Sequence, residues 1–201
     1  LLAHAGVDAR WCLVHATHMN ATETAGLARS GAVAGLAPTT EADLGDGTFN
    51  GTGFLDEGGR FGVGSDSNTI VDPFAELRQL EWSQRLARQA RNVLASHDGA
   101  NIGTALWSHA ASAGAQAIGR PAGAIAVGRR ADLVVLNPAD VALATTPRDA
   151  LLDAAIFGPC RAPVRDVMIG GRWVVRDGHH RAEERITARF LSTMAAREED
   201  G

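Results

Sequence analysis

Three short apolar runs in this sequence each lead directly into polar residues, and this arrangement leaves few folds open. The runs are residues 11–14, 32–36 and 60–64, and the first and third lead into His15 and Asp66. Short apolar runs are typical of strands buried on both faces of a parallel sheet. Because parallel strands end at the same edge of their sheet, we expect the His15 and Asp66 side chains to lie on one face.

Segments with helical spacing separate and follow these runs. The clearest begins at Asn20, a good N-cap residue with Glu23 three positions later, and ends at Ser30. A long helix is predicted over residues 73–95, with Pro73 in its first turn, and another over residues 100–118. Strands that alternate with helices predict a parallel α/β sheet with its helices outside.

The pattern changes after Gly119. Residues 124–136 are predicted to form two strands around a turn at Gly128, and residues 164–175 a hairpin around a Gly-Gly pair. A charged helix is predicted over residues 181–199. We therefore divide the chain into residues 1–118, with the parallel sheet, and residues 119–201, with a separate antiparallel layer and the C-terminal helix.

Composition excludes several classes of function. The 201 residues are 45% hydrophobic, carry a net charge of −4 and have a pI near 6.0, so neither nucleic acid nor an anionic membrane is an expected partner. Two cysteines, Cys12 and Cys160, are too few for a disulfide framework. The sequence contains no apolar run of transmembrane length. We expect a cytoplasmic protein that acts on a small molecule.

Asp66 is the strongest candidate for chemistry. It lies in the segment Gly-Ser-Asp-Ser-Asn, directly after a predicted buried strand, where the backbone can approach a ligand closely. A carboxylate there can hold a zinc ion and accept a proton from a bound water. The alternative is an Asx turn that caps the next helix.

The remaining candidates are weaker. His15 is followed by His18. Spacing alone favours equally a functional pair and a combination of one structural and one surface histidine. Residues 38–47 are predicted to form a polar loop after the second strand, in which Glu41 and Asp43 are candidates for substrate contact. His109 lacks a partner at metal-ligand spacing, so we interpret it as a structural or surface histidine.

Several segments, taken in order, resemble the amidohydrolase superfamily. The matching segments are WCLVHATH, GAVAGLAPTTEADLGDG, GRFGVGSDSN and ELRQLEWSQRLARQARN, and the tail AGAIAVGRRADLVVLN with VRDVMIGGRWVVRDG. PTTEADLGDG and LEWSQRLARQARN resemble the branch that deiminates N-formimidoyl-L-glutamate to N-formyl-L-glutamate and ammonia, in histidine catabolism. Related aminohydrolases usually carry a Ser-Asn pair where this chain has Thr40-Glu41.

The resemblance implies a fold. Residues 1–118 would be the C-terminal part, about strands 6–8, of a (β/α)8 TIM-type barrel, and residues 119–201 the return strands of a β-sandwich with the terminal helix. Since the chain starts at Leu1 inside an amphipathic pattern, we expect an upstream part to be missing. The chain by itself is then expected to be inactive and poorly stable, because its sheet has open edges.

The resemblance also implies roles for particular residues. Asp66 matches a zinc ligand and proton shuttle, and His15 matches a catalytic histidine that stabilises the tetrahedral centre. Glu41 would help to select the cationic formimidoyl group. The other ligands of a single divalent metal, the acid/base glutamate and the residues that hold the glutamyl carboxylates are expected upstream. A guanine, cytosine or S-adenosylhomocysteine deaminase, and an inactive truncated product, are the alternatives; a homodimer is left open.

Overall fold

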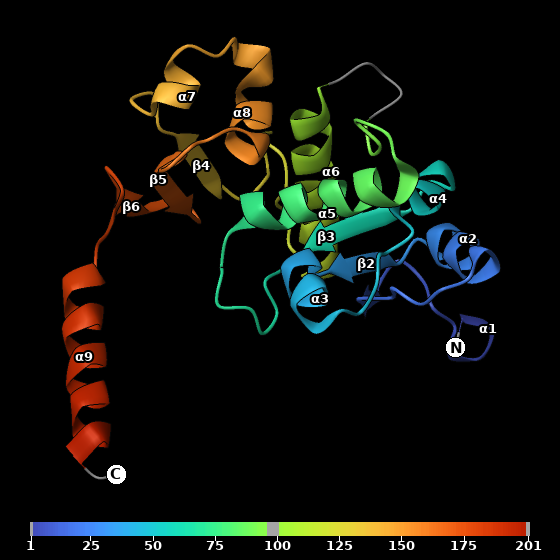
Figure 1. Ribbon diagram of the computed structural model, residues 1–201, viewed down its shortest axis with the longest axis horizontal. Helices are drawn as coiled ribbons and strands as arrows, with labels where there is room; N and C mark the ends of the chain where they lie inside the picture. The colour runs from blue at the N-terminus through green and yellow to red at the C-terminus, as the bar shows by residue number, and fades with distance from the viewer. Residues whose placement is uncertain (1, 96–100, 200–201) are drawn as a thin grey trace.

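The computed structural model describes residues 2–95 and 101–199 and contains two sheets (Figure 1). The first is three-stranded and parallel, in the order β1-β2-β3, and comprises Cys12–Val14, Val33–Leu36 and Arg60–Val63. Its strands coincide with the three apolar runs. The prediction of a parallel α/β sheet is therefore confirmed.

The short helix α1 precedes β1, and helices follow each of the three strands. Their bounds are α1 Leu2–Ala5, α2 Ala21–Ser30, α3 Pro38–Leu44, α4 Gly51–Asp56, α5 Pro73–Arg88 and α6 Ile102–Ala117. The capping box predicted for α2 is confirmed, because Asn20 accepts a hydrogen bond from the backbone of Glu23 and Glu23 accepts one from the backbone of Asn20. The predicted start of α6 at residue 100 lies outside the described residues.

Two predictions about the helices beside the parallel sheet were wrong. Residues 38–44 form helix α3 and not a loop, with Pro38 in its first turn. Helix α5 ends at Arg88 and does not continue to residue 95, because Gln89 adopts a left-handed conformation at the C-cap, with φ 53°.

The core lies between the parallel sheet and helices α5 and α6 (Figure 1). Its largest fully buried apolar side chains are Leu27, Leu36, Phe54, Leu77, Leu80, Leu106 and Ile156. Helix α6 packs very closely on β3, since a Cβ on Gly62 would lie 3.1 Å from the Cα of Gly114. Glu81 and Gln84 of α5 are polar but buried, and backbone N–H groups hydrogen-bond to both.

The second sheet is four-stranded and antiparallel, in the order β4-β5-β6-β7. Its strands are Leu133–Leu136, Val164–Ile169, Arg172–Arg176 and His179–His180. The predicted hairpin is confirmed: Gly170 and Gly171 join β5 to β6 with φ values of 56° and 78°, which suits the two-residue turn of a twisted hairpin.

Between β4 and β5 the chain forms α7 (Val141–Ala144), a short 3-10 helix (Arg148–Ala150) and α8 (Leu151–Phe157). Ile156 of α8 joins the same core as α5 and α6, so the two parts of the chain pack against each other. The division at residue 118 stays a prediction. The strand predicted before Gly128 is absent: residues 124–128 pair with no described strand, and the Ile125 side chain is exposed.

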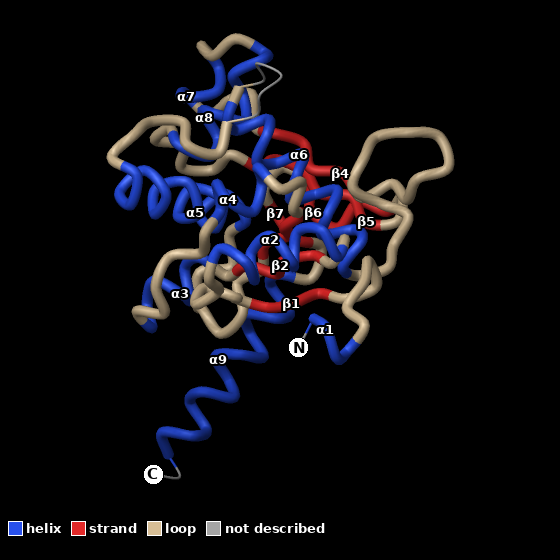
Figure 2. Tube along the Cα trace, turned by 90° about the vertical axis from the view of Figure 1, so that its right-hand side faces the viewer, coloured by secondary structure: helices blue, strands red, loops and turns tan. Residues whose placement is uncertain are grey.

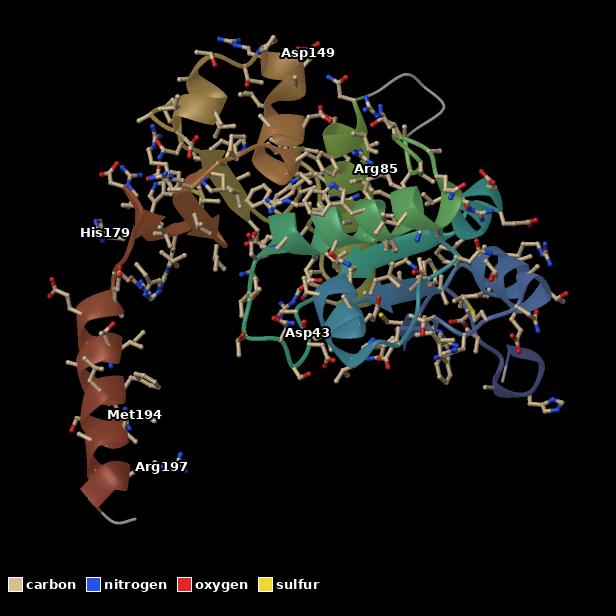
Figure 3. All side chains as sticks on the ribbon, in the orientation of Figure 1. Asp43, Arg85, Asp149, His179, Met194 and Arg197 are labelled. Atoms are coloured by element: carbon tan, nitrogen blue, oxygen red, sulfur yellow. The ribbon has the colours of Figure 1, made fainter. Side chains whose placement is uncertain are left out.

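The last helix, α9 (Glu183–Glu199), begins two residues later than predicted and extends away from both sheets (Figures 1 and 2). Met194 and Arg197 lie on this projecting helix (Figure 3). Its apolar side chains Ile186, Phe190 and Met194 are exposed. In the part of the chain that the structure describes, no helix is long and apolar enough to cross a membrane.

Two glycines of α6 test the packing of α6 on α8. A Cβ on Gly103 would lie 2.5 Å from the backbone nitrogen of Asp153, whereas a Cβ on Gly114 would meet no atom within 4 Å. We expect Gly103→Ala to lower the free energy of unfolding by about 1–3 kcal/mol, because it overpacks the contact with α8. We expect Gly114→Ala to raise it by about 0.5–1 kcal/mol, because alanine favours helix. Denaturant unfolding of both variants checks the opposite signs.

Candidate functional site

His15 follows β1 directly and lies at the carboxyl edge of the parallel sheet. Its backbone N–H donates to the carbonyl of Gly35 at 2.9 Å, which extends the pairing with β2 by one residue. The φ angles of His15 and Ala16 are 64° and 54°, in the left-handed region that few non-glycine residues adopt. The chain therefore turns sharply where the imidazole is presented.

Asp66 lies at the same edge, beyond β3. Its φ is 49°, a conformation that aspartate tolerates better than most residues, and the N–H of Asn68 closes the turn on the carbonyl of Ser65 at 3.0 Å. Its Oδ2 lies 3.8 Å from Nε2 of His15. The predicted proximity of these two side chains is confirmed, while their chemical roles stay predictions.

The alternative interpretation of Asp66 as a helix cap is wrong. The N-cap of α5 is Asp72, whose side chain accepts a hydrogen bond from the backbone N–H of Phe74 at 2.8 Å. In the described part of the chain, no backbone N–H donates to the Asp66 carboxylate, and its side chain is 45% exposed. The carboxylate is therefore free to meet a ligand.

Glu41 reaches the site from the interior. Its side chain is 5% exposed, its Oε1 accepts a hydrogen bond from the backbone N–H of Ala37 at 2.9 Å, and the same oxygen lies within hydrogen-bond distance of Nδ1 of His15, at 3.2 Å. The sequence placed Glu41 in a rim loop, but it lies on α3 with its carboxylate directed inward. Its predicted contact with substrate stays a prediction.

Two threonines of the first turn of α3 connect this helix to its surroundings. The Thr40 hydroxyl donates to the carbonyl of Ser65 at 2.8 Å, next to Asp66. The backbone N–H of Thr39 donates to the buried Glu76 carboxylate of α5 at 3.0 Å, and its hydroxyl donates to the same group.

Burial raises the pKa of Glu76, and the charges of Glu41 and Asp72 raise it further, whereas the hydrogen bonds from Thr39 lower it. Sequence reasoning marked Thr40 only as part of the Thr40-Glu41 pair and missed Glu76, because nothing in the local sequence of Glu76 marks it.

The site offers a pair of metal donors. A zinc ion accepts carboxylate oxygen and imidazole nitrogen, which Asp66 and His15 present side by side. No group of three or more histidine, cysteine, aspartate or glutamate residues within residues 2–95 and 101–199 could hold a metal ion. His18 does not join the pair; both histidines line a hollow at the surface with Ala16, Thr17, Met19, Glu23 and Asp46.

A second hollow lies at the amino end of β3, at the opposite end of that strand from Asp66. Gly59, Arg60 and His109 are among its lining residues. The His109 ring stacks on Phe61 with ring centroids 4.6 Å apart, and burial lowers its pKa. We assign His109 a packing role, in agreement with the sequence analysis.

Comparison with known proteins relates this chain to a family. The amidohydrolase family matches residues 2–174. The chain is 52% identical to formimidoylglutamate deiminase from Pseudomonas aeruginosa, over 96% of this chain and 43% of that protein. A crystal structure of an amidohydrolase from Brucella melitensis matches 98% of this chain and 43% of its own, with 46% identity and a TM-score of 0.89.

A more distant match is the crystal structure of an adenosine deaminase from Xanthomonas campestris with bound zinc. It is 23% identical, with a TM-score of 0.74 over 89% of this chain and 43% of its own, and shows likeness of fold. The chain thus spans less than half the length of the relatives that it matches.

The contact between Thr40 and Ser65 yields a stability prediction. Thr40→Val keeps the side-chain shape but removes the hydroxyl, so the Ser65 carbonyl loses its donor. We expect a loss of about 1–3 kcal/mol in the free energy of unfolding. Thr40→Ser retains the hydroxyl and should recover most of this loss; equal losses in both variants would assign the effect to packing of the methyl group.

Proposed function

Since this chain belongs to the amidohydrolase family, we propose that the protein carrying it deiminates N-formimidoyl-L-glutamate to N-formyl-L-glutamate and ammonia with the aid of a divalent metal. The observation that carries the proposal is the 52% identity to formimidoylglutamate deiminase over 96% of the chain. The parallel strands β1, β2 and β3 then correspond to about strands 6–8 of a (β/α)8 barrel, whose active site lies at the carboxyl ends of its strands.

Asp66 and His15 take the two roles that this chain can supply. Asp66 is the metal ligand and accepts a proton from the attacking water. His15 stabilises the tetrahedral centre that forms when the water oxygen adds to the formimidoyl carbon. The proton that Asp66 took from the water and the proton of the new hydroxyl both pass to the terminal nitrogen. The bond from the carbon to this nitrogen then breaks, the formyl carbonyl forms and ammonia leaves. The metal, which we propose to be zinc, lowers the pKa of a water molecule toward neutrality.

The donors on this chain fit such a metal in type and position but not in number. Structural and catalytic zinc sites use at least three protein ligands, whereas the described residues bring together one carboxylate and one imidazole. We propose that the other ligands, the acid that protonates the departing nitrogen and the groups that bind the glutamyl carboxylates lie in the part of the relatives' length that this chain does not span.

The experiment is an assay of the protein at the full length of its relatives. Formimidoylglutamate is expected to yield equal amounts of ammonia and N-formylglutamate. Proton NMR follows the formation of N-formylglutamate. Adenosine, guanine, cytosine and S-adenosylhomocysteine are the comparison substrates. Faster ammonia release from any of these would replace the proposed substrate with that one, and release from none would favour an inactive product.

Asp66→Asn in the same full-length protein removes a ligand charge and the proton acceptor together. We expect kcat to fall by about 10²–10⁴-fold or more, the range that general acid–base catalysis contributes. Asp72→Asn is the control, because asparagine also caps helices and Asp72 lies outside the site. Near-normal turnover by Asp66→Asn would contradict the role assigned to this residue.

The 201-residue chain by itself should behave differently. We expect no tightly held, stoichiometric zinc, measured by elemental analysis after dialysis, because His15 and Asp66 fall short of a ligand set. We also expect association in light scattering, because β1 pairs only with β2 among the described strands and leaves a parallel edge open. A monomer that melts cooperatively with one zinc per chain would contradict both expectations.

A further inference from the structure

Three side chains form a line from the interior to the surface at the carboxyl edge of the sheet. Glu41 is 5% exposed, His15 36% and Asp66 45%. Glu41 Oε1 lies 3.2 Å from Nδ1 of His15, and the opposite ring nitrogen, Nε2, lies 3.8 Å from Oδ2 of Asp66. The buried carboxylate therefore contacts the imidazole on the side away from Asp66.

The contacts of Glu41 decide which ring nitrogen carries the proton. Its Oε1 already accepts from the backbone N–H of Ala37, a group that can only donate. A carboxylate oxygen in this acceptor role also accepts from His15, so Nδ1 is the donor. In the neutral ring Nε2 then has a lone pair, and this nitrogen faces Asp66.

The backbone around His15 needs such support. Two successive non-glycine residues, His15 and Ala16, have positive φ angles, and such conformations persist only where surrounding contacts over-determine them. One of these contacts is the hydrogen bond between the His15 N–H and Gly35, and another is the Glu41 carboxylate. The imidazole is thus held at both its backbone and its ring.

Glu41 is itself held in place by the rest of its helix turn. Thr40 donates to the Ser65 carbonyl beside Asp66, and Thr39 donates to the buried Glu76 of α5. The first turn of α3 therefore contacts His15 through one residue and the end of β3 through the next. Any shift of this turn would move the two candidate catalytic side chains relative to each other.

We propose that Glu41 is a positioning residue that holds His15 in one orientation and in the tautomer with its proton on Nδ1. This role rests on the function proposed above for the same site. The Nε2 lone pair of His15 can then accept a hydrogen bond from the hydroxyl that forms on the formimidoyl carbon. With the proton on Nε2, the ring would direct a donor at that hydroxyl. In this role Glu41 acts through His15, in place of the substrate contact predicted from the sequence.

The first test measures the tautomer in the full-length protein labelled with nitrogen-15 in its histidines, without substrate. His15→Asn identifies the His15 signals. In the neutral His15 ring of the wild-type protein, Nδ1 should bear the proton and Nε2 should be unprotonated. Glu41→Gln should give a mixture of tautomers, because a side-chain amide can both donate and accept.

Glu81→Gln is the matched control. Glu81 is a fully buried carboxylate on α5 that accepts hydrogen bonds from the backbone N–H groups of Val93 and Leu94, at 2.9 and 3.0 Å, and from Nε of Arg85 at 2.7 Å, and it has no contact with His15. This variant loses the same buried charge, so it should lower stability as Glu41→Gln does. The His15 tautomer and kcat should stay at their wild-type values.

The second test separates positioning from substrate contact. Glu41→Gln should lower kcat for formimidoylglutamate by about 10–100-fold, the usual effect of removing a partner that orients a ligand or catalytic side chain, with KM little changed. A raised KM with an unchanged tautomer would show that Glu41 contacts the substrate and would overturn the proposal. A wild-type proton on Nε2 would overturn it without any variant.

The two proposals fail in different ways. Absence of ammonia release from formimidoylglutamate by the wild-type protein would reject the proposed substrate. The tautomer measurement needs no turnover, so it still decides whether Glu41 orients His15.

Discussion

The parallel pairing of β1, β2 and β3 is the constraint on which the site depends. In this register Val14, Gly35 and Gly62 lie side by side, so the chain leaves all three strands at the same edge. Backbone hydrogen bonds from His15 to Gly35 and from Gly64 to Leu36, each 2.9 Å long, continue the pairing past the strand ends. Residues 51 positions apart in the sequence, His15 and Asp66, meet because of this geometry.

Buried polar groups of α5 fasten the segments around the sheet. Glu76 holds the first turn of α3, Glu81 holds the backbone at Val93 and Leu94, and Gln84 bridges the carbonyl of Phe49 and the N–H of Gly51. Burial of these groups would be unfavourable without such partners. Each one instead satisfies a backbone group of a segment that lacks a strand or a long helix to pair it. The helix thus supports the site without reaching it.

The fold of this chain recurs in a more distant protein. The crystal structure of an adenosine deaminase with bound zinc has the same fold at 23% identity, and a fold by itself does not identify a substrate. In this chain the carboxyl edge carries a buried glutamate behind the histidine and a threonine against the third strand. Helix α3 is only seven residues long, but its first turn contributes Thr40 and Glu41 to the site. The strands alone do not provide these contacts.

Local sequence was sufficient wherever a short segment contains its own signal. The three apolar runs, the capping box of α2 and the Gly170-Gly171 turn each rest on neighbouring residues, and each formed as predicted. Apolar strands that end in His15 and Asp66 also placed these two side chains together, because parallel strands end at one edge.

Tertiary contacts decided the rest. Residues 38–44 are polar enough to resemble a loop, yet they form a helix whose first turn is held by Glu76, 37 residues beyond Thr39. Glu41 looked like a rim residue, but His15, 26 positions away, pairs with it in the interior. Residues 124–128 have the composition of a strand, but they pair with no strand in the described part of the chain. Hydrogen-bond partners distant in sequence determine whether a polar group is buried and whether an apolar segment pairs, and no local pattern contains that information.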